Sequence, residues 1–189
     1  PANIARLVAS LGNYIYAYGD NSVYVNLYVG SNTSLNLKNG PVGLKMETNY
    51  PWEGSVKINI DPIKKSAFRL ALRLPGWVNN VGAPGGLYSI QQDGENWGSA
   101  HSNLVLKLNG KEIAYTLKDG YMLVESVWKK GDQLEFEFPM EIKRINARAE
   151  LKQDLGRIAI QRGPIVYCVE GADNNGKAWN IIVPEDTKF

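Results

Sequence analysis

Only one cysteine, Cys168, and one histidine, His101, occur among the 189 residues of the sequence. A single cysteine cannot form an internal disulfide bond, which excludes a disulfide-stabilised scaffold. The two residues are also too few and too far apart in the chain to supply a typical zinc site. His101 lies in a polar stretch rich in Gly, Asn and Ser, where we expect a surface side chain and not a catalytic base. Cys168 lies within the apolar run 165–169, which predicts a buried and unreactive thiol.

The sequence also lacks a strong excess of charge and a long apolar run. It has 21 basic and 19 acidic residues, which gives a formal net charge of +2. The basic residues do not gather into a patch, so we expect no nucleic-acid partner. No apolar run approaches the roughly 18 residues of a membrane-spanning helix, so we expect no membrane partner. The hydrophobic content of 44% is enough to form the core of an ordinary globular domain.

The spacing of the apolar residues predicts one short helix followed only by strands. Ile4, Leu7, Val8 and Leu11 fall on one face of a helix, which we expect over 3–11. After Tyr18, apolar and polar residues alternate with a period of two, as they do in strands that bury one face. The clearest predicted strands cover 23–29, 56–60, 68–74, 104–108 and 134–138. Turn signals such as Asn109-Gly110 and Asp119-Gly120 separate strands, which favours an all-β sandwich or barrel.

One stretch interrupts the strand pattern. Residues 78–103 are rich in Gly, Asn, Ser and Pro, and we expect a long loop or an insertion there. The last apolar run is 165–169, and the tail after it is polar. We therefore predict a β-sandwich domain over 19–170, with a linker or the start of a further domain over 171–189.

Aromatic residues suggest a carbohydrate ligand. The chain has five Trp and ten Tyr, and sugar C–H faces stack on rings of this kind at half-wet sites. Trp52 and Trp77 stand beside turn residues, and Trp97 lies in the long loop, so these three are the candidates for sugar stacking. The competing interpretation is that they close the open ends of a sandwich core, because most large aromatic side chains are buried.

Carboxylates and one arginine are the remaining candidates for chemistry. Glycoside hydrolysis usually needs two carboxylates that flank one bond, but no spacing in the sequence pairs any two of them. The carboxylates considered are Glu47, Glu53, Asp61, Glu125 and Asp154. Glu135 and Glu137 alternate with apolar residues, which predicts that water solvates them. Arg162 lies between two apolar runs, where it could pair with a carboxylate and fix an interdomain contact, or simply mark a bend at Gly163-Pro164.

Five strings, taken in order and at their separations, resemble glycoside hydrolase family 127, the β-L-arabinofuranosidase-like family. They are NIARL at 3–7, YVNLYV at 24–29, ETNYPW at 47–52, LRLPGW at 72–77 and GRIAIQRGP at 156–164. The resemblance implies a large (α/α)6 barrel that precedes β-sandwich domains. On this basis residues 1–18 correspond to the last helix of a truncated barrel, and residues 19–170 form an antiparallel, jelly-roll-like β-sandwich.

The resemblance carries no catalytic or metal residue onto this chain. In the family, a Cys-Cys-Pro-x-Asn motif supplies a nucleophilic thiolate and a zinc ligand, and Pro1-Ala2-Asn3 matches only the end of that motif. The cysteines and the other zinc ligands would lie upstream of Pro1, so we expect no cofactor in this chain.

The resemblance and the residues together predict two functions. The first is a non-catalytic segment of a glycoside hydrolase, inactive alone, that supports the missing N-terminal catalytic barrel. The alternative is a carbohydrate-binding module that recognises plant-type oligosaccharides through exposed Trp residues. Without the barrel, the apolar helix face would lie open, and self-association through that face is then expected.

Overall fold

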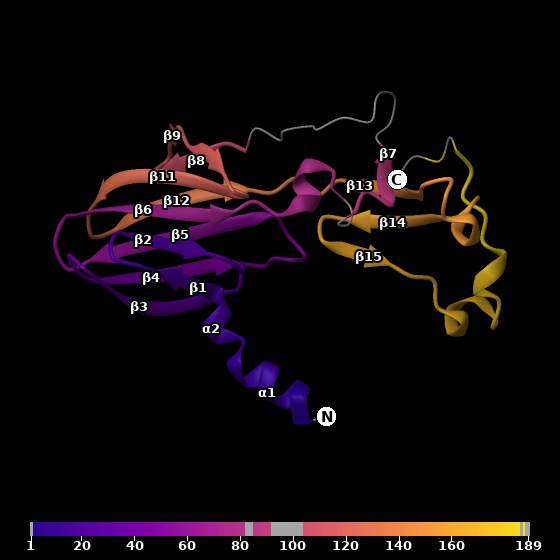
Figure 1. Ribbon diagram of the computed structural model, residues 1–189, viewed down its shortest axis with the longest axis horizontal. Coiled ribbons are helices and arrows are strands. Elements are labelled where there is room, and N and C mark those ends of the chain that lie inside the picture. The colour runs from indigo at the N-terminus through magenta and orange to yellow at the C-terminus, as the bar shows by residue number, and fades with distance from the viewer. Residues whose placement is uncertain (1, 82–84, 92–103, 186, 188–189) are drawn as a thin grey trace.

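The computed structural model describes residues 2–81, 85–91, 104–185 and 187 (Figure 1). It opens with helix α1 (Ala2–Ser10) and the single turn α2 (Gly12–Ile15), which confirms the helix predicted over 3–11. None of the residues of α1 is buried. Figure 1 shows this helix extending away from the sheets, so nothing in the described part of the chain covers its apolar face.

The rest of the described chain is mainly strands, as the alternation of residues predicts. The strands are β1 (Tyr16–Tyr18), β2 (Ser22–Val25), β3 (Ser31–Leu37), β4 (Gly40–Thr48), β5 (Ser55–Pro62), β6 (Ser66–Arg73), β7 (Tyr88–Gln91), β8 (Leu106–Leu108), β9 (Lys111–Ile113), β10 (Thr116–Lys118), β11 (Tyr121–Trp128), β12 (Asp132–Glu137), β13 (Ile142–Ala147), β14 (Ile158–Arg162) and β15 (Ile165–Tyr167). Short 3-10 helices are η1 (Gly76–Asn79), η2 (Lys152–Asp154), η3 (Gly171–Asn174) and η4 (Ala178–Asn180). The all-β prediction is therefore confirmed.

Two sheets form the sandwich. The first sheet has the strand order β1-β2-β6-β11-β10, and the second has the order β3-β4-β5-β12-β8-β9. Pairing in these sheets is antiparallel except between β2 and β6, which run parallel with Val23 opposite Leu70. The hairpins β8–β9 and β10–β11 turn at Asn109-Gly110 and Asp119-Gly120. All four of these residues have positive φ, as two-residue hairpin loops of this kind require.

The core lies between the first and second sheets. Leu70, Leu72 and Met122 of the first sheet meet Ile58 and Leu134 of the second, and each is fully buried. Burial of one such side chain stabilises the fold by about 1.5–3 kcal/mol. The alternation predicted from the sequence therefore defines the inner faces, and every apolar side chain of this core lies between residues 15 and 138.

A third sheet, with the order β15-β14-β13-β7, lies beyond one end of the sandwich (Figure 1). It includes β7, at 88–91, which falls in the stretch expected to be a loop or an insertion. β7 pairs with β13 through Tyr88 and Ala147. The predicted sandwich domain of 19–170 therefore contains two structural parts, and the predicted boundary at 171 stays a prediction.

Candidate functional site

The three tryptophans predicted to stack on a sugar differ in exposure. Trp52 lies in the turn between β4 and β5, and 67% of its surface is exposed. Trp77 lies in η1 with 9% exposed, and its ring packs edge-on against Phe138 at 5.8 Å between ring centroids. Its indole Nε1–H donates to the Tyr50 hydroxyl at 3.3 Å. Trp77 is therefore a core side chain with no open face for a sugar, and Trp97 lies outside the described residues.

Sequence reasoning missed a further exposed indole. Trp179 lies in η4, and 88% of its surface is exposed. Lys177 and Ala178 precede it, the apolar residues 181–183 follow after Asn180, and this segment shows no strand or helix period. The only available signal was therefore the residue type itself.

Arg162 connects the third sheet to the sandwich. It is the last residue of β14, and its guanidinium Nη1 donates to the main-chain oxygen of Trp52 at 2.9 Å. The acceptor is thus a carbonyl and not the carboxylate considered from the sequence. This bond joins residues 110 positions apart in the chain.

A buried lysine makes a second link at the same junction. Lys143 of β13 has only 8% of its side chain exposed, and its Nζ donates to Asn80 Oδ1 at 2.7 Å. Asn80 follows η1 in a left-handed conformation with φ of 59°. Burial lowers the pKa of Lys143 because it disfavours the ammonium form, and the carboxylate of Glu141 at 4.0 Å opposes this effect. Nothing in the sequence pattern indicated that this lysine would be buried.

Two glycines allow close contacts at the junction. A Cβ on Gly54 would lie 2.0 Å from the main-chain oxygen of Phe138, whose N–H donates to the Gly54 carbonyl at 2.9 Å. Gly163 has φ of +56°, and a Cβ there would lie 2.6 Å from the Met140 sulfur. A side chain at Gly54 would require the main chain to shift. At Gly163 the Met140 side chain could move, but the positive φ still favours glycine.

Three of the five strings that carry the family resemblance meet at this junction. Residues 47–52 contribute Tyr50 and Trp52, residues 72–77 contribute Trp77, and residues 156–164 contribute Arg162 and Gly163. These strings are separated in sequence and are brought together only by the fold. They therefore describe how the third sheet is attached to the sandwich.

Each of the five carboxylates considered as catalytic candidates has a local partner. The partners are the Lys45 ammonium for Glu47, the Asn49 amide for Glu53, the Gly131 N–H for Asp61, the Arg69 guanidinium for Glu125 and the Tyr88 hydroxyl for Asp154. Lys45 lowers the pKa of Glu47 by hydrogen bonding and by its charge. The acid of a glycosidase needs the opposite shift, toward a raised pKa. The shift at Glu47 is therefore not the one that a general acid needs.

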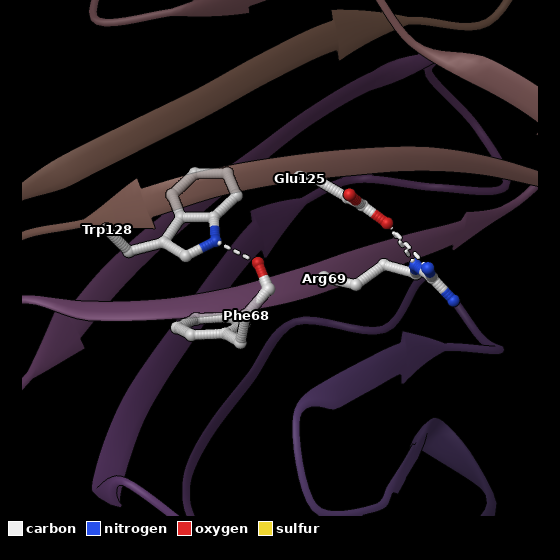
Figure 2. Close-up of polar contacts among 4 residues, drawn as sticks. All are labelled: Phe68, Arg69, Glu125 and Trp128. Carbon is white, nitrogen blue, oxygen red and sulfur yellow. Dashed lines mark hydrogen bonds and ion pairs between the residues drawn. The ribbon is translucent and has the colours of Figure 1, made fainter.

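Arg69 and Glu125 form an ion pair on the outer surface of the first sheet, and Figure 2 shows their arrangement. Arg69 donates from Nε at 2.9 Å and from Nη2 at 2.5 Å, and both bonds reach the same oxygen, Glu125 Oε1. In the buried part of the same two strands, the Trp128 indole donates to the Phe68 carbonyl at 2.8 Å. Alternation places Arg69 and Glu125 outward, but their pairing across β6 and β11 could not be found from sequence.

Metal binding finds no support in the described part of the chain. No group of three or more His, Cys, Asp or Glu side chains there could hold a metal ion. The zinc implied by the resemblance does not fit these residues, and we derive no step through it.

Cys168 is exposed, so the prediction of a buried thiol is wrong. The reason is that β15 ends at Tyr167 and that no described residue of the third sheet belongs to the hydrophobic core. His101 lies outside the described residues.

Of the helices described, none has the length and apolar character needed to cross a membrane.

Comparisons with known proteins show that this chain matches two domain models of one family. Residues 22–140 match the family model described as "Beta-L-arabinofuranosidase, GH127 middle domain". Residues 142–189 match the "Glycoside hydrolase family 127 C-terminal domain". The border between the two matches coincides with the step from the sandwich to β13.

Individual relatives agree with the family models. A non-reducing end β-L-arabinofuranosidase of Bifidobacterium longum subsp. longum is 31% identical over 95% of this chain. A solved β-arabinofuranosidase of the family is 36% identical over 92% of the chain, with a TM-score of 0.82. A β-L-arabinofuranosidase of Geobacillus stearothermophilus T6 is 35% identical over 93% of the chain, with a TM-score of 0.75.

The chain spans only about a quarter of the length of these relatives: 24% of the Bifidobacterium protein, 26% of the first structure and 24% of the second. Together, the two family models match residues 22–140 and 142–189 of this chain. The chain therefore belongs to glycoside hydrolase family 127, whose middle and C-terminal domains it matches.

Proposed function

We propose that this chain supports the catalytic domain of a family 127 glycoside hydrolase and contributes no catalytic residue. The observation that carries the proposal is the uncovered apolar face of α1. Ile4, Leu7 and Val8 are exposed by 67%, 57% and 67% of their surfaces. A helix of this length is marginal in water and needs a packing partner, and a contiguous apolar patch marks a contact surface.

The comparisons support the identity of that partner. The two matches are to a middle and a C-terminal domain, and the relatives hold about three quarters of their length outside the matched region. The middle-domain match begins at residue 22, so a domain that precedes it in the polypeptide would adjoin the segment that holds α1. The proposed partner is therefore the N-terminal catalytic domain, and the activity of the whole protein would be that of a β-L-arabinofuranosidase.

The test is a binding titration against the separately produced N-terminal part of the Geobacillus relative, with that relative's own matched region as the positive control. We expect the chain to bind and to raise the thermal midpoint of the catalytic part. Leu7→Glu should abolish binding, because it places a charge in the apolar face. Ala9→Glu, on the opposite face of α1, should bind normally. The chain alone should not hydrolyse an aryl β-L-arabinofuranoside above a buffer blank.

Binding by the positive control without binding by this chain would overturn the supporting role. Equal binding by both variants would remove α1 from the interface. Hydrolysis by the chain alone would contradict the absence of catalytic residues.

Carbohydrate binding is the second candidate function, and the 67% exposure of Trp52 favours it. The Arg162 bond to the Trp52 carbonyl holds the turn that presents this ring. Stacking on a single ring gives an apolar contact with one sugar unit.

A further inference from the structure

A groove of about 480 Å³ lies over β6 and β11, away from the junction and from Trp52. Its lining includes Asn21, Ser22, Arg69, Glu125 and Val127. The pairing of the strands shows why one side of this site is open. β10 pairs only with Tyr121–Leu123, so it does not continue alongside Glu125. The volume lies within the range of small-ligand sites, roughly 300–1,000 Å³.

The polar groups of the groove present both a donor and an acceptor. Because both Arg69 bonds end on Oε1, Glu125 Oε2 has no partner among the described residues and can accept a hydrogen bond. The guanidinium has five N–H groups. Glu125 uses two of them and Tyr24 also interacts with the guanidinium, which still leaves N–H groups for a ligand. Two neighbouring hydroxyls of a sugar supply the complementary pair, since one can donate to Oε2 while the other accepts from the guanidinium.

The groove also has a hydrogen-bonded base and an apolar wall. Phe68 contributes to the lining, and the Trp128 indole bond to its carbonyl ties β6 to β11 beneath the ion pair (Figure 2). The main-chain N–H of Arg69 donates to the Asn21 carbonyl at 2.9 Å, which fixes the Asn21 main chain at the rim. Val127 is 63% exposed and offers apolar surface to sugar C–H groups. Because these hydrogen bonds fix the groove before a ligand arrives, less conformational entropy is lost on binding.

The outer face of the second sheet gives a direct contrast. There, residues paired on five neighbouring strands alternate in sign: Glu47, Lys57, Glu135, Lys107 and Glu112. Lys57 and Glu135 lie 3.1 Å apart in this row. By the strand register, each inner charge of this row has an opposite charge on both sides. Arg69 lies opposite the uncharged Ser22 on β2, and its pair with Glu125 keeps unused hydrogen-bonding capacity.

We propose that the groove beside Arg69 and Glu125 binds a neutral saccharide, with Glu125 and Arg69 contacting adjacent hydroxyls and Val127 contacting the ring. The Arg69–Glu125 pair has no net charge. An anion would be repelled by the carboxylate and a cation by the guanidinium. Paired donors and acceptors beside apolar surface suit a polyhydroxyl ring. This site does not depend on the supporting role proposed for α1.

The experiment is calorimetry together with amide chemical-shift mapping of the chain, titrated with arabinotriose, xylotriose and cellotriose. We expect saturable binding of at least one sugar, with shifts centred on β6 and β11. Glu125→Gln should weaken binding by about tenfold or more, because a hydrogen bond to a charged group is lost. Val127→Lys should weaken it as well, because the longer side chain fills the groove.

Two further variants separate this site from others. Glu135→Gln changes the matched carboxylate on the opposite face and should bind like the unchanged chain, as should Trp52→Ala. The absence of saturable binding for all three sugars would overturn the proposal. Loss of binding in Trp52→Ala with retention in Glu125→Gln and Val127→Lys would overturn it too, and would assign sugar binding to the turn at Trp52. The catalytic part of the relative could cause amide chemical-shift changes in the groove while the sugars cause none. That result would overturn the proposal and assign this face to a protein contact instead.

Discussion

The sandwich and the third sheet are built from strands of similar type, yet among the described residues only those of the sandwich form a core. Every buried apolar side chain of the described chain lies between residues 15 and 138. In the third sheet and its tail, Ile142, Val166, Tyr167 and Ile182 are all exposed, from 43% to 86%. The physical reason is the number of layers, because a sheet must bury one face against another element.

The difference shows what holds the third sheet in place. Its buried groups are polar: Lys143, Arg144 and Gln161. Arg144 donates to the carbonyls of Pro184 and Thr187, which ties the tail to β13. Attachment therefore rests on directed hydrogen bonds and on the close contacts at the junction. Hydrogen bonds of this kind contribute about 0.5–1.5 kcal/mol each, or up to about 3 kcal/mol with a charged partner.

The largest expected effect comes from deleting a core side chain. Leu70→Ala should lower the free energy of unfolding by about 2–5 kcal/mol, because it leaves a cavity between the two sheets. Val166→Ala, at a position 59% exposed in the third sheet, should change it by about 0.5 kcal/mol or less. Urea unfolding followed by Trp fluorescence measures both. A comparable loss in the two variants would show that the third sheet has a core of its own.

The next effect tests the packing at the junction. Gly54→Ala places a Cβ against the Phe138 carbonyl, which is main chain and cannot rotate away. We expect a loss of about 1–3 kcal/mol in the free energy of unfolding. Gly12→Ala is the matched control, because a Cβ there meets nothing within 4 Å. If Gly54→Ala were as stable as Gly12→Ala, the close approach of the β4–β5 turn to the end of β12 would be contradicted.

The smallest effect concerns the link between the two parts. Arg162→Ala removes the bond to the Trp52 carbonyl and should leave the stability of the sandwich nearly unchanged. Amide hydrogen exchange in β14 and β15 should become several-fold faster, because the free energy of local opening falls by roughly 1 kcal/mol. Arg157→Ala, in the turn that precedes β14, serves as the control. Unchanged exchange in β14 and β15 would mean that Arg162 does not secure the third sheet.

The strands of the sandwich could be predicted from the sequence. In a fold of two layers, the alternation of apolar and polar residues indicates directly which side chains are buried. Leu70 and Leu72 could be assigned to an inner face from their period alone, and Asn109-Gly110 marked a hairpin from its turn chemistry. Sequence reasoning failed at Cys168, where an apolar run resembled a core strand. A local pattern shows which face of a strand is apolar, but it cannot show whether a second layer covers that face.

Residue type and spacing therefore determined the class of fold, the short N-terminal helix and the strings that identify the family. The tertiary structure decided which aromatic ring is accessible, since Trp77 fills the core while Trp52 stays exposed. It also decided which charges meet, because Arg69 and Glu125 are 56 residues apart and pair only through the register of β6 with β11. Local propensity acts over a few residues, whereas these contacts depend on chain segments that approach one another only after the sheets have formed.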